Sequence, residues 1–108
     1  MRPIVLTQTD TGSSSMAVLD HYQTPFNVGL GCVISGTPTY TVEHTFDDVL
    51  AEGVTPTWFP HPDLTDQTAD ADGNYAFPVR AIRVTVSAVG DVADSVTATV
   101  IQAGMPGR

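Results

Sequence analysis

The sequence predicts an all-β fold, a single antiparallel β-sandwich over residues 1–108 with about seven or eight short strands, for which a jelly roll is one arrangement. Three observations predict this class. Apolar and polar residues alternate in four segments, turn-forming residues recur at short intervals, and no segment keeps a helical period. The clearest alternation gives one strand an apolar face made of Phe26, Val28, Leu30, Cys32 and Ile34.

The first two strands are short. Residues 4–8 are apolar and rich in β-formers, and residues 16–19 form a second short apolar run. Between them, residues 10–15 contain Gly and small polar side chains, which favours a turn or a flexible loop.

Two longer strands follow, over residues 26–34 and 39–46. Residues 35–38 separate them with Gly and Pro, so the pair is expected to form a β-hairpin. The second strand of this pair alternates as well, and one of its faces carries Tyr40, Val42, His44 and Phe46.

The middle of the chain is less regular, and its end predicts a second hairpin. Residues 47–53 could hold one helical turn, residues 57–59 form a short aromatic strand, and residues 61–75 form a long polar loop. Residues 82–88 and 96–100 then alternate strictly and are expected to pair across a Gly-Asp turn.

Composition excludes several classes of partner. The net charge is -8, there is no Lys, and the basic residues are four Arg. Such a chain is repelled by phosphate and anionic lipid, so no nucleic acid or membrane partner is expected.

The single cysteine, Cys32, excludes an internal disulfide and is expected to be buried. The opening residues lack the apolar stretch of a signal peptide, so synthesis in a cytoplasm is expected.

No group of residues predicts catalysis, a cofactor or a metal site. Ser13, Ser14 and Ser15 lie in a predicted loop outside any nucleophile motif. Residues 70–74 resemble a calcium loop, but the Gly comes too early and no Glu closes the loop. The three histidines lack a zinc-ligand spacing. We therefore expect a protein that is not an enzyme.

Four residues are candidates for protein contacts. Trp58 and Phe59 could form a contact hot spot or a sugar-stacking platform, or one of them could simply fill the core. Arg80 and Arg83 are either surface ion pairs or ligands for a carboxylate across a subunit contact.

Residues 26–103 resemble a pattern of small virion structural proteins of tailed bacteriophages. The resemblance rests on the segment 40–48, on Thr57-Trp58-Phe59, on the strand 77–83 and on the closing Val100-Ile101-Gln102. It implies a β-sandwich located in the virion and made in the host cytoplasm, most plausibly a capsid decoration, or cement, protein. The implied partners are the major capsid protein and copies of the chain itself, with a trimer expected and a dimer as the alternative. Two other functions remain open, a neck or tail protein of the same fold and a carbohydrate-binding module.

Overall fold

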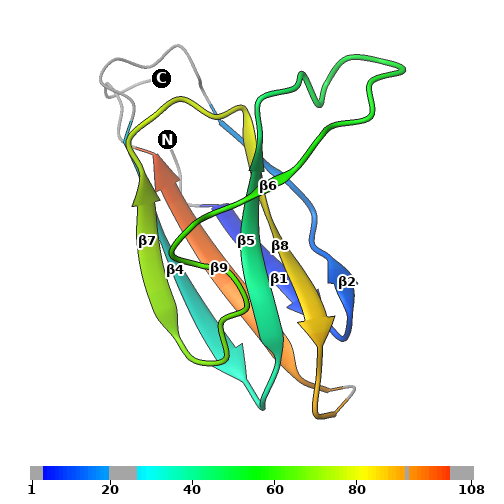
Figure 1. Cartoon of the computed structure of the whole chain (residues 1–108), viewed down its shortest axis with the longest axis vertical. Coiled ribbons are helices and arrows are strands. Elements are labelled where there is room, and N and C mark those ends of the chain that lie inside the picture. Colours follow the sequence, from blue (N-terminus) through cyan, green and yellow to red (C-terminus); the bar gives the residue numbers. More distant parts are fainter. Residues whose placement is uncertain (1–3, 20–26, 92, 103–108) are drawn as a thin grey trace.

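Two antiparallel sheets pack face to face in the computed structural model, which describes residues 4–19, 27–91 and 93–102 (Figure 1). The first sheet has the strand order β1 (Ile4–Thr9), β9 (Ser95–Gln102), β4 (Val28–Ser35), β7 (Ala71–Tyr75). In the second sheet the central strands are β5 (Thr39–Thr45) and β8 (Ala81–Ala88), flanked by the two-residue strands β2 (Gly12–Ser13), β3 (Ala17–Val18) and β6 (Phe59–Pro60). The predicted all-β sandwich is confirmed, whereas the jelly-roll arrangement stays a prediction.

The hydrophobic core lies between the sheets and follows the predicted alternation. Val28, Leu30 and Cys32 are buried in β4, and Tyr40, Val42 and His44 are buried in β5. Burial of such apolar surface stabilises the fold by about 25 cal/mol per Å². Both central strands of the second sheet and all four strands of the first contribute to the same cluster. Its members include Leu6, Val42, Leu64, Tyr75, Ile82, Val84, Val96 and Val100. Burial raises the pKa of the Cys32 thiol to about 11, which fits an inert core cysteine.

Both predicted hairpins are wrong. Strands β4 and β5 belong to different sheets, and so do β8 and β9. Instead, β4 pairs with β9 over its whole length, and β5 pairs with β8. Alternation shows that each strand has an apolar face, but it does not show where the next strand lies. The next strand can pair beside it in the same sheet, or it can pack against it from the other sheet across the core.

Two loops cross from one sheet to the other, the loop between β4 and β5 and the loop between β8 and β9, and Asp94 joins them. Its Oδ2 accepts hydrogen bonds from the backbone N–H groups of Thr37 (3.1 Å), Gly90 (2.9 Å) and Asp91 (3.0 Å). These bonds, with that of Thr37 foremost, lower the pKa of the Asp94 carboxyl below 3.8. Gly36 lies against this carboxylate with φ +83°, and a Cβ at position 36 would collide with Asp94 Oδ1. We call this group of residues, at the lower end of Figure 1, the clamp end.

Two segments predicted as loops contain strands. Residues 10–15 include β2, which pairs with β8. Residues 61–75 include β7, which pairs with β4 from Val28↔Tyr75 to Cys32↔Ala71. Both strands lie at sheet edges and consist mostly of small or polar residues, so neither shows a clear apolar pattern in the sequence.

Three further expectations change in detail. Residues 47–53 form a turn, in which the Asp48 carbonyl accepts from Ala51 N–H, and no helix occurs in the described part of the chain. The strand predicted over residues 16–19 is reduced to β3, and the aromatic strand begins at Phe59. Phe26 lies outside the described residues.

The free edge of β5 is covered by the segment that follows β6. Val42 N–H donates to the Leu64 carbonyl, and His61 N–H donates to the Val42 carbonyl. Tyr40 and Gln67 exchange a pair of backbone hydrogen bonds. This segment therefore satisfies the strand edge and adds Leu64 to the core.

The residues described include no helix long and apolar enough to cross a bilayer.

Candidate protein-contact surface

An aromatic cluster closes the sandwich at the end opposite the clamp. His44 of β5 lies at its centre, with ring centroids 5.4 Å from Phe46, 6.1 Å from Phe59 and 5.6 Å from Phe77. Tyr75, the last residue of β7, packs edge-on against His44 at 5.0 Å. The cluster thus joins the second sheet to the edge strand of the first.

Three rings of this cluster are exposed to solvent. Phe46 is 50% exposed, Phe59 46% and Phe77 45%. Their centroids are 6.0 Å apart for Phe46 and Phe59 and 6.3 Å apart for Phe46 and Phe77. We call these three rings the aromatic patch. Adjacent exposed aromatic rings are typical of surfaces that bind other proteins, because each ring buries much apolar area at little conformational cost.

The patch rests on a hydrogen-bonded base. His44 Nδ1 and the Tyr75 hydroxyl are 2.9 Å apart, and both residues are buried. His61 packs edge-on against Tyr75 at 4.8 Å. The His61 Nε2 donates to the Asn74 carbonyl at 2.9 Å, and its Nδ1 accepts from Asp63 N–H at 3.1 Å. These two bonds hold the His61 ring in one orientation.

Burial shifts the pKa values of the two residues beneath the patch, His44 and Tyr75. It lowers the pKa of His44 below 6.5, with a smaller contribution from His61. It also raises the pKa of the Tyr75 phenol, and the charges of Cys32 and Glu43 act in the same direction. Both groups are therefore neutral at pH 7, and the base of the patch carries no charge.

The structure separates the two aromatic candidates of the sequence. Phe59 is part of the aromatic patch, but Trp58 packs on Arg83, whose guanidinium carbon is 4.2 Å from the ring centroid. Trp58 is half-buried on the outer side of the second sheet, and Phe59 is exposed, so neither ring fills the core. A cation over an aromatic face is stabilising, and this contact covers one face of Trp58.

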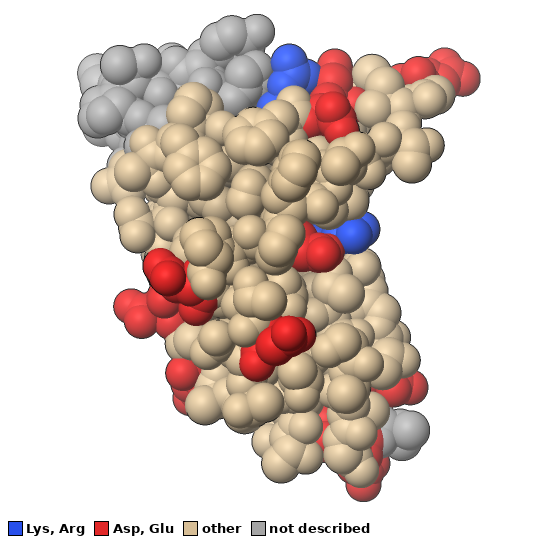
Figure 2. Space-filling view, in the orientation of Figure 1, with Lys and Arg blue, Asp and Glu red and all other residues tan. Residues whose placement is uncertain are grey.

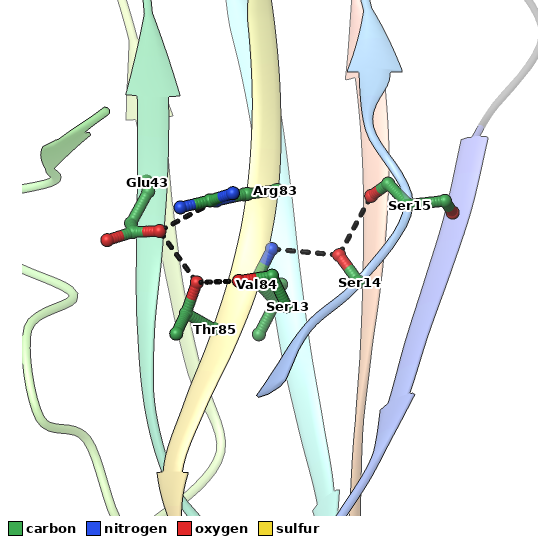
Figure 3. A network of polar contacts seen from close by, with 7 residues as sticks. All are labelled: Ser13, Ser14, Ser15, Glu43, Arg83, Val84 and Thr85. Carbon is green, nitrogen blue, oxygen red and sulfur yellow. Dashed lines mark hydrogen bonds and ion pairs between the residues drawn. The ribbon is translucent and has the colours of Figure 1, made fainter. Parts of the chain in front are cut away.

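Arg83 belongs to a polar network on the outer face of the second sheet (Figure 3). Its Nε donates to Glu43 Oε1 at 2.8 Å, and Thr85 Oγ1 donates to the same oxygen at 2.6 Å. Thr85 Oγ1 also lies 2.9 Å from Ser13 Oγ. The carboxylate that Arg83 binds is thus in its own chain, on the neighbouring strand.

The serines of the 10–15 segment have structural partners. The buried Ser14 Oγ accepts from Val84 N–H at 3.0 Å and donates to the Ser15 carbonyl at 2.8 Å (Figure 3). These bonds attach the segment to β8, where Ser14 N–H also donates to the Val84 carbonyl.

Arg80 forms a longer ion pair. Its Nη1 lies 3.5 Å from Asp48 Oδ2, with side-chain exposures of 34% and 51%. Such an exposed pair contributes little to stability.

The other two aromatic residues of the patch, Phe46 and Phe77, were not among the predicted contact residues. Phe46 has the parity of a core residue, and only its position just beyond the end of β5 exposes it.

The acidic residues that the structure describes are dispersed. Figure 2 shows them scattered over the visible face, with wide uncharged surface between them. Residues 70–74 have structural roles. Asp70 Oδ1 accepts a hydrogen bond from Ile34 N–H of β4 at 2.9 Å, and residues 71–74 form most of β7. Within the described ranges, no group of three His, Cys, Asp or Glu side chains could hold a metal ion.

Comparison of the chain with known protein families, with curated proteins and with solved structures found no match.

Proposed function

We propose that this chain is a virion structural protein that decorates the outer face of an assembled phage capsid and stabilises it, binding the major capsid protein through the aromatic patch. The observation that carries the proposal is the trio of half-exposed Phe rings at one end of a sandwich whose other end is closed by internal hydrogen bonds. The phage assignment itself comes from the resemblance of residues 26–103 to small virion proteins.

The patch suits a protein partner. Its rings are tilted against one another, by 54° for Phe46 and Phe59 and 33° for Phe46 and Phe77, so they form a ridged surface. Ridged apolar surfaces interlock with the side chains of a complementary surface, and aromatic residues, Phe among them, are enriched in the buried cores of interfaces. A sugar, in contrast, stacks on one flat ring, and Arg83 covers one face of Trp58.

The small core also favours a role in a larger assembly. A chain of 108 residues without a disulfide has limited stability of its own. Binding that occurs only in the assembled state shifts the equilibrium toward that state, and therefore toward intact particles. Self-association, as the expected trimer or as a dimer, would multiply the number of contacts with the shell.

The test compares particles of the parent phage assembled with and without the gene. We expect particles that carry the protein to release their genome at a higher temperature, measured by the fluorescence of a DNA-binding dye during heating. Equal release temperatures, with the protein demonstrated on the first set of particles, would remove the cement role. The neck or tail function would then lead, and immunogold labelling of the particles would locate the protein.

A further inference from the structure

Strand β1 is an open edge of the first sheet. It pairs with β9 from Ile4↔Val100 to Thr9↔Ser95, and no other strand among the described residues pairs with it. Its sequence, IVLTQT, contains no charged residue, Gly or Pro, and its register has no bulge. Natural proteins usually protect an edge strand with charges, Pro or bulges, because an open edge pairs readily with another chain. Strand β1 has none of these devices.

The other sheet edges are protected. The segment after β6 covers the edge of β5 with backbone hydrogen bonds. On the far side of the first sheet, β7 carries the charged Asp72, and its Asn74 carbonyl accepts from His61 Nε2 at 2.9 Å. The remaining edge strands β2, β3 and β6 have two residues each, and short length is itself a protection. Strand β1 is therefore the longest open edge in the described part of the chain.

The register shows which backbone groups of β1 point away from β9. Asp10 N–H donates to the Asp94 carbonyl at 3.2 Å, and this pair continues the register of the two strands by one residue. In an antiparallel ladder, hydrogen-bonded pairs alternate with pairs whose N–H and C=O groups point outward. Val5, Thr7 and Thr9 therefore direct their backbone groups toward the open edge.

Most of these outward groups lack a partner within the described residues. Gln8 Nε2 donates to the Thr9 carbonyl at 3.3 Å, which agrees with the outward direction of that carbonyl. The N–H groups of Val5, Thr7 and Thr9 and the carbonyls of Val5 and Thr7 form no hydrogen bond with the described part of the chain. They repeat every two residues, about 6.8 Å apart, and this is the spacing of the complementary groups on another extended strand.

The side chains beside the edge favour an apolar strand. Val5 is 59% exposed on the outer side of β1, and Ile4 is only half-buried on the side of the core. A strand added to β1 would place its alternate side chains beside these two residues, one on each face of the sheet. The edge therefore suits a segment with β-branched or other apolar residues at alternate positions and without Pro.

We infer that the open edge of β1 binds an extended segment of the major capsid protein, which adds to the first sheet as a further strand. The inference rests on the proposed function and adds a second contact to the aromatic patch. In such β-strand addition, backbone hydrogen bonds hold the segment and alternate side chains select it. A second copy of this chain is a poorer occupant, because two chains that each carry a net charge of -8 repel one another.

The first test is amide hydrogen exchange of the full chain, free and bound to phage heads that lack it, with the exchange quenched and read by NMR. We expect the amides of Val5, Thr7 and Thr9 to exchange at least about tenfold more slowly on the heads, because each gains a backbone hydrogen bond. Leu6 and Gln8 are the internal reference. Their N–H groups already point toward β9, so their exchange should change much less.

The second test removes one outward donor. Thr7→Pro deletes the N–H of residue 7 without a loss of bonds to β9, since Pro is tolerated on an edge strand where its nitrogen faces solvent. We expect it to bind the heads at least about tenfold more weakly than the wild type. If circular dichroism shows that Thr7→Pro does not fold, Thr9→Pro removes another outward donor in the same way.

Asp72→Pro is the matched control for this substitution. Position 72 lies on the opposite edge of the same sheet, two residues from the Asn74 carbonyl that faces His61, so its N–H also points away from the neighbouring strand β4. This variant should bind the heads as the wild type does.

The outcomes separate this inference from the proposed function. A wild type that does not bind the heads would overturn both. Binding without slower exchange at Val5, Thr7 and Thr9, or wild-type affinity of a folded Pro variant of β1, would overturn strand addition and leave the capsid role standing. Slower exchange of the same three amides in the free chain at high concentration would assign the edge to a second copy, which also contradicts the inference.

Discussion

The two ends of the sandwich use their side chains in opposite ways. At the clamp end, Asp94 accepts backbone hydrogen bonds from both crossing loops, and its side chain is buried. At the other end, Phe46, Phe59 and Phe77 leave about half of their surface in water. The clamp carboxylate is satisfied within the chain, whereas the aromatic end leaves apolar rings in water. One end therefore contributes to folding, and the other is the end to which we assign binding.

The largest expected effect comes from the glycine of the clamp. Gly36→Ala should lower the free energy of unfolding by about 3 kcal/mol or more, because Ala is strained at positive φ and its Cβ collides with Asp94. Gly53→Ala is the matched control. Gly53 has nearly the same φ, +81° against +83°, but a Cβ there meets nothing within 4 Å, so only the conformational cost of about 1 kcal/mol applies. Urea denaturation measures both values, and equal losses would show that the clamp contributes nothing.

The aromatic end should be less sensitive. Phe46→Ser, Phe59→Ser or Phe77→Ser alone should each cost about 1 kcal/mol, because each ring is only half-buried and full burial of Phe is worth about 1.5–3 kcal/mol. The measurement is again urea denaturation. Losses above about 3 kcal/mol for each ring, the level of core truncations, would mean that these side chains serve folding rather than binding.

The two ends should also lose stability in different ranges of pH. The pKa of His44 is lowered on folding, so the unfolded chain binds a proton that the folded chain resists, and stability falls as the pH drops through 6.5 toward the lower folded value. The Asp94 pKa is lowered as well, so its stabilisation is present above 3.8 and is lost as the pH falls through the lower folded value.

His44→Gln tests the first of these two ranges. The amide can keep a hydrogen bond to Tyr75 but does not titrate, so the variant should show a smaller fall in unfolding free energy between about pH 7 and pH 5 than the wild type. Identical slopes for the two proteins would contradict the assignment of acid sensitivity to the aromatic end.

The smallest effect is expected at Arg80. Arg80→Gln removes an exposed ion pair with Asp48 and should change the free energy of unfolding by less than about 0.5 kcal/mol. Arg83→Gln should cost more, because Arg83 binds Glu43 and covers Trp58 in a half-buried network. Equal costs for the two variants in thermal denaturation would show that the network adds nothing to a simple surface pair.

Alternation was sufficient to predict the all-β sandwich and the burial of Val28, Leu30 and Cys32, because one apolar face per strand is what a sandwich core requires. It was not sufficient for the pairing of strands. The turns at Gly36 and Gly90 look like hairpin turns in the sequence, but Asp94 holds them as crossings between sheets. Nothing local in the sequence distinguishes the two, since the bond from Thr37 to Asp94 joins residues that are 57 positions apart.

Only part of the aromatic patch could be predicted from the sequence, again because its residues come together from distant parts of the chain. Phe59 could be recognised beside Trp58 as an aromatic segment between prolines, but its neighbours Phe46 and Phe77 come from other parts of the chain. Phe46 has the parity of a core residue and is exposed only because β5 ends at Thr45. Edge strand β7 was missed because its residues are mostly small or polar, and this strand places Tyr75 under the patch.

The most direct test of the account is the affinity of the chain for phage heads that lack it, measured for the wild type and for two variants. We predict that the combined Phe46→Ser, Phe59→Ser and Phe77→Ser variant, shown by circular dichroism to be folded, binds at least about 30-fold more weakly, since loss of a hot spot costs about 2 kcal/mol or more. Ala88→Ser, a polar change at an exposed position of the clamp end, should bind as the wild type does. Wild-type affinity for the folded triple variant would contradict the assignment of binding to the aromatic end.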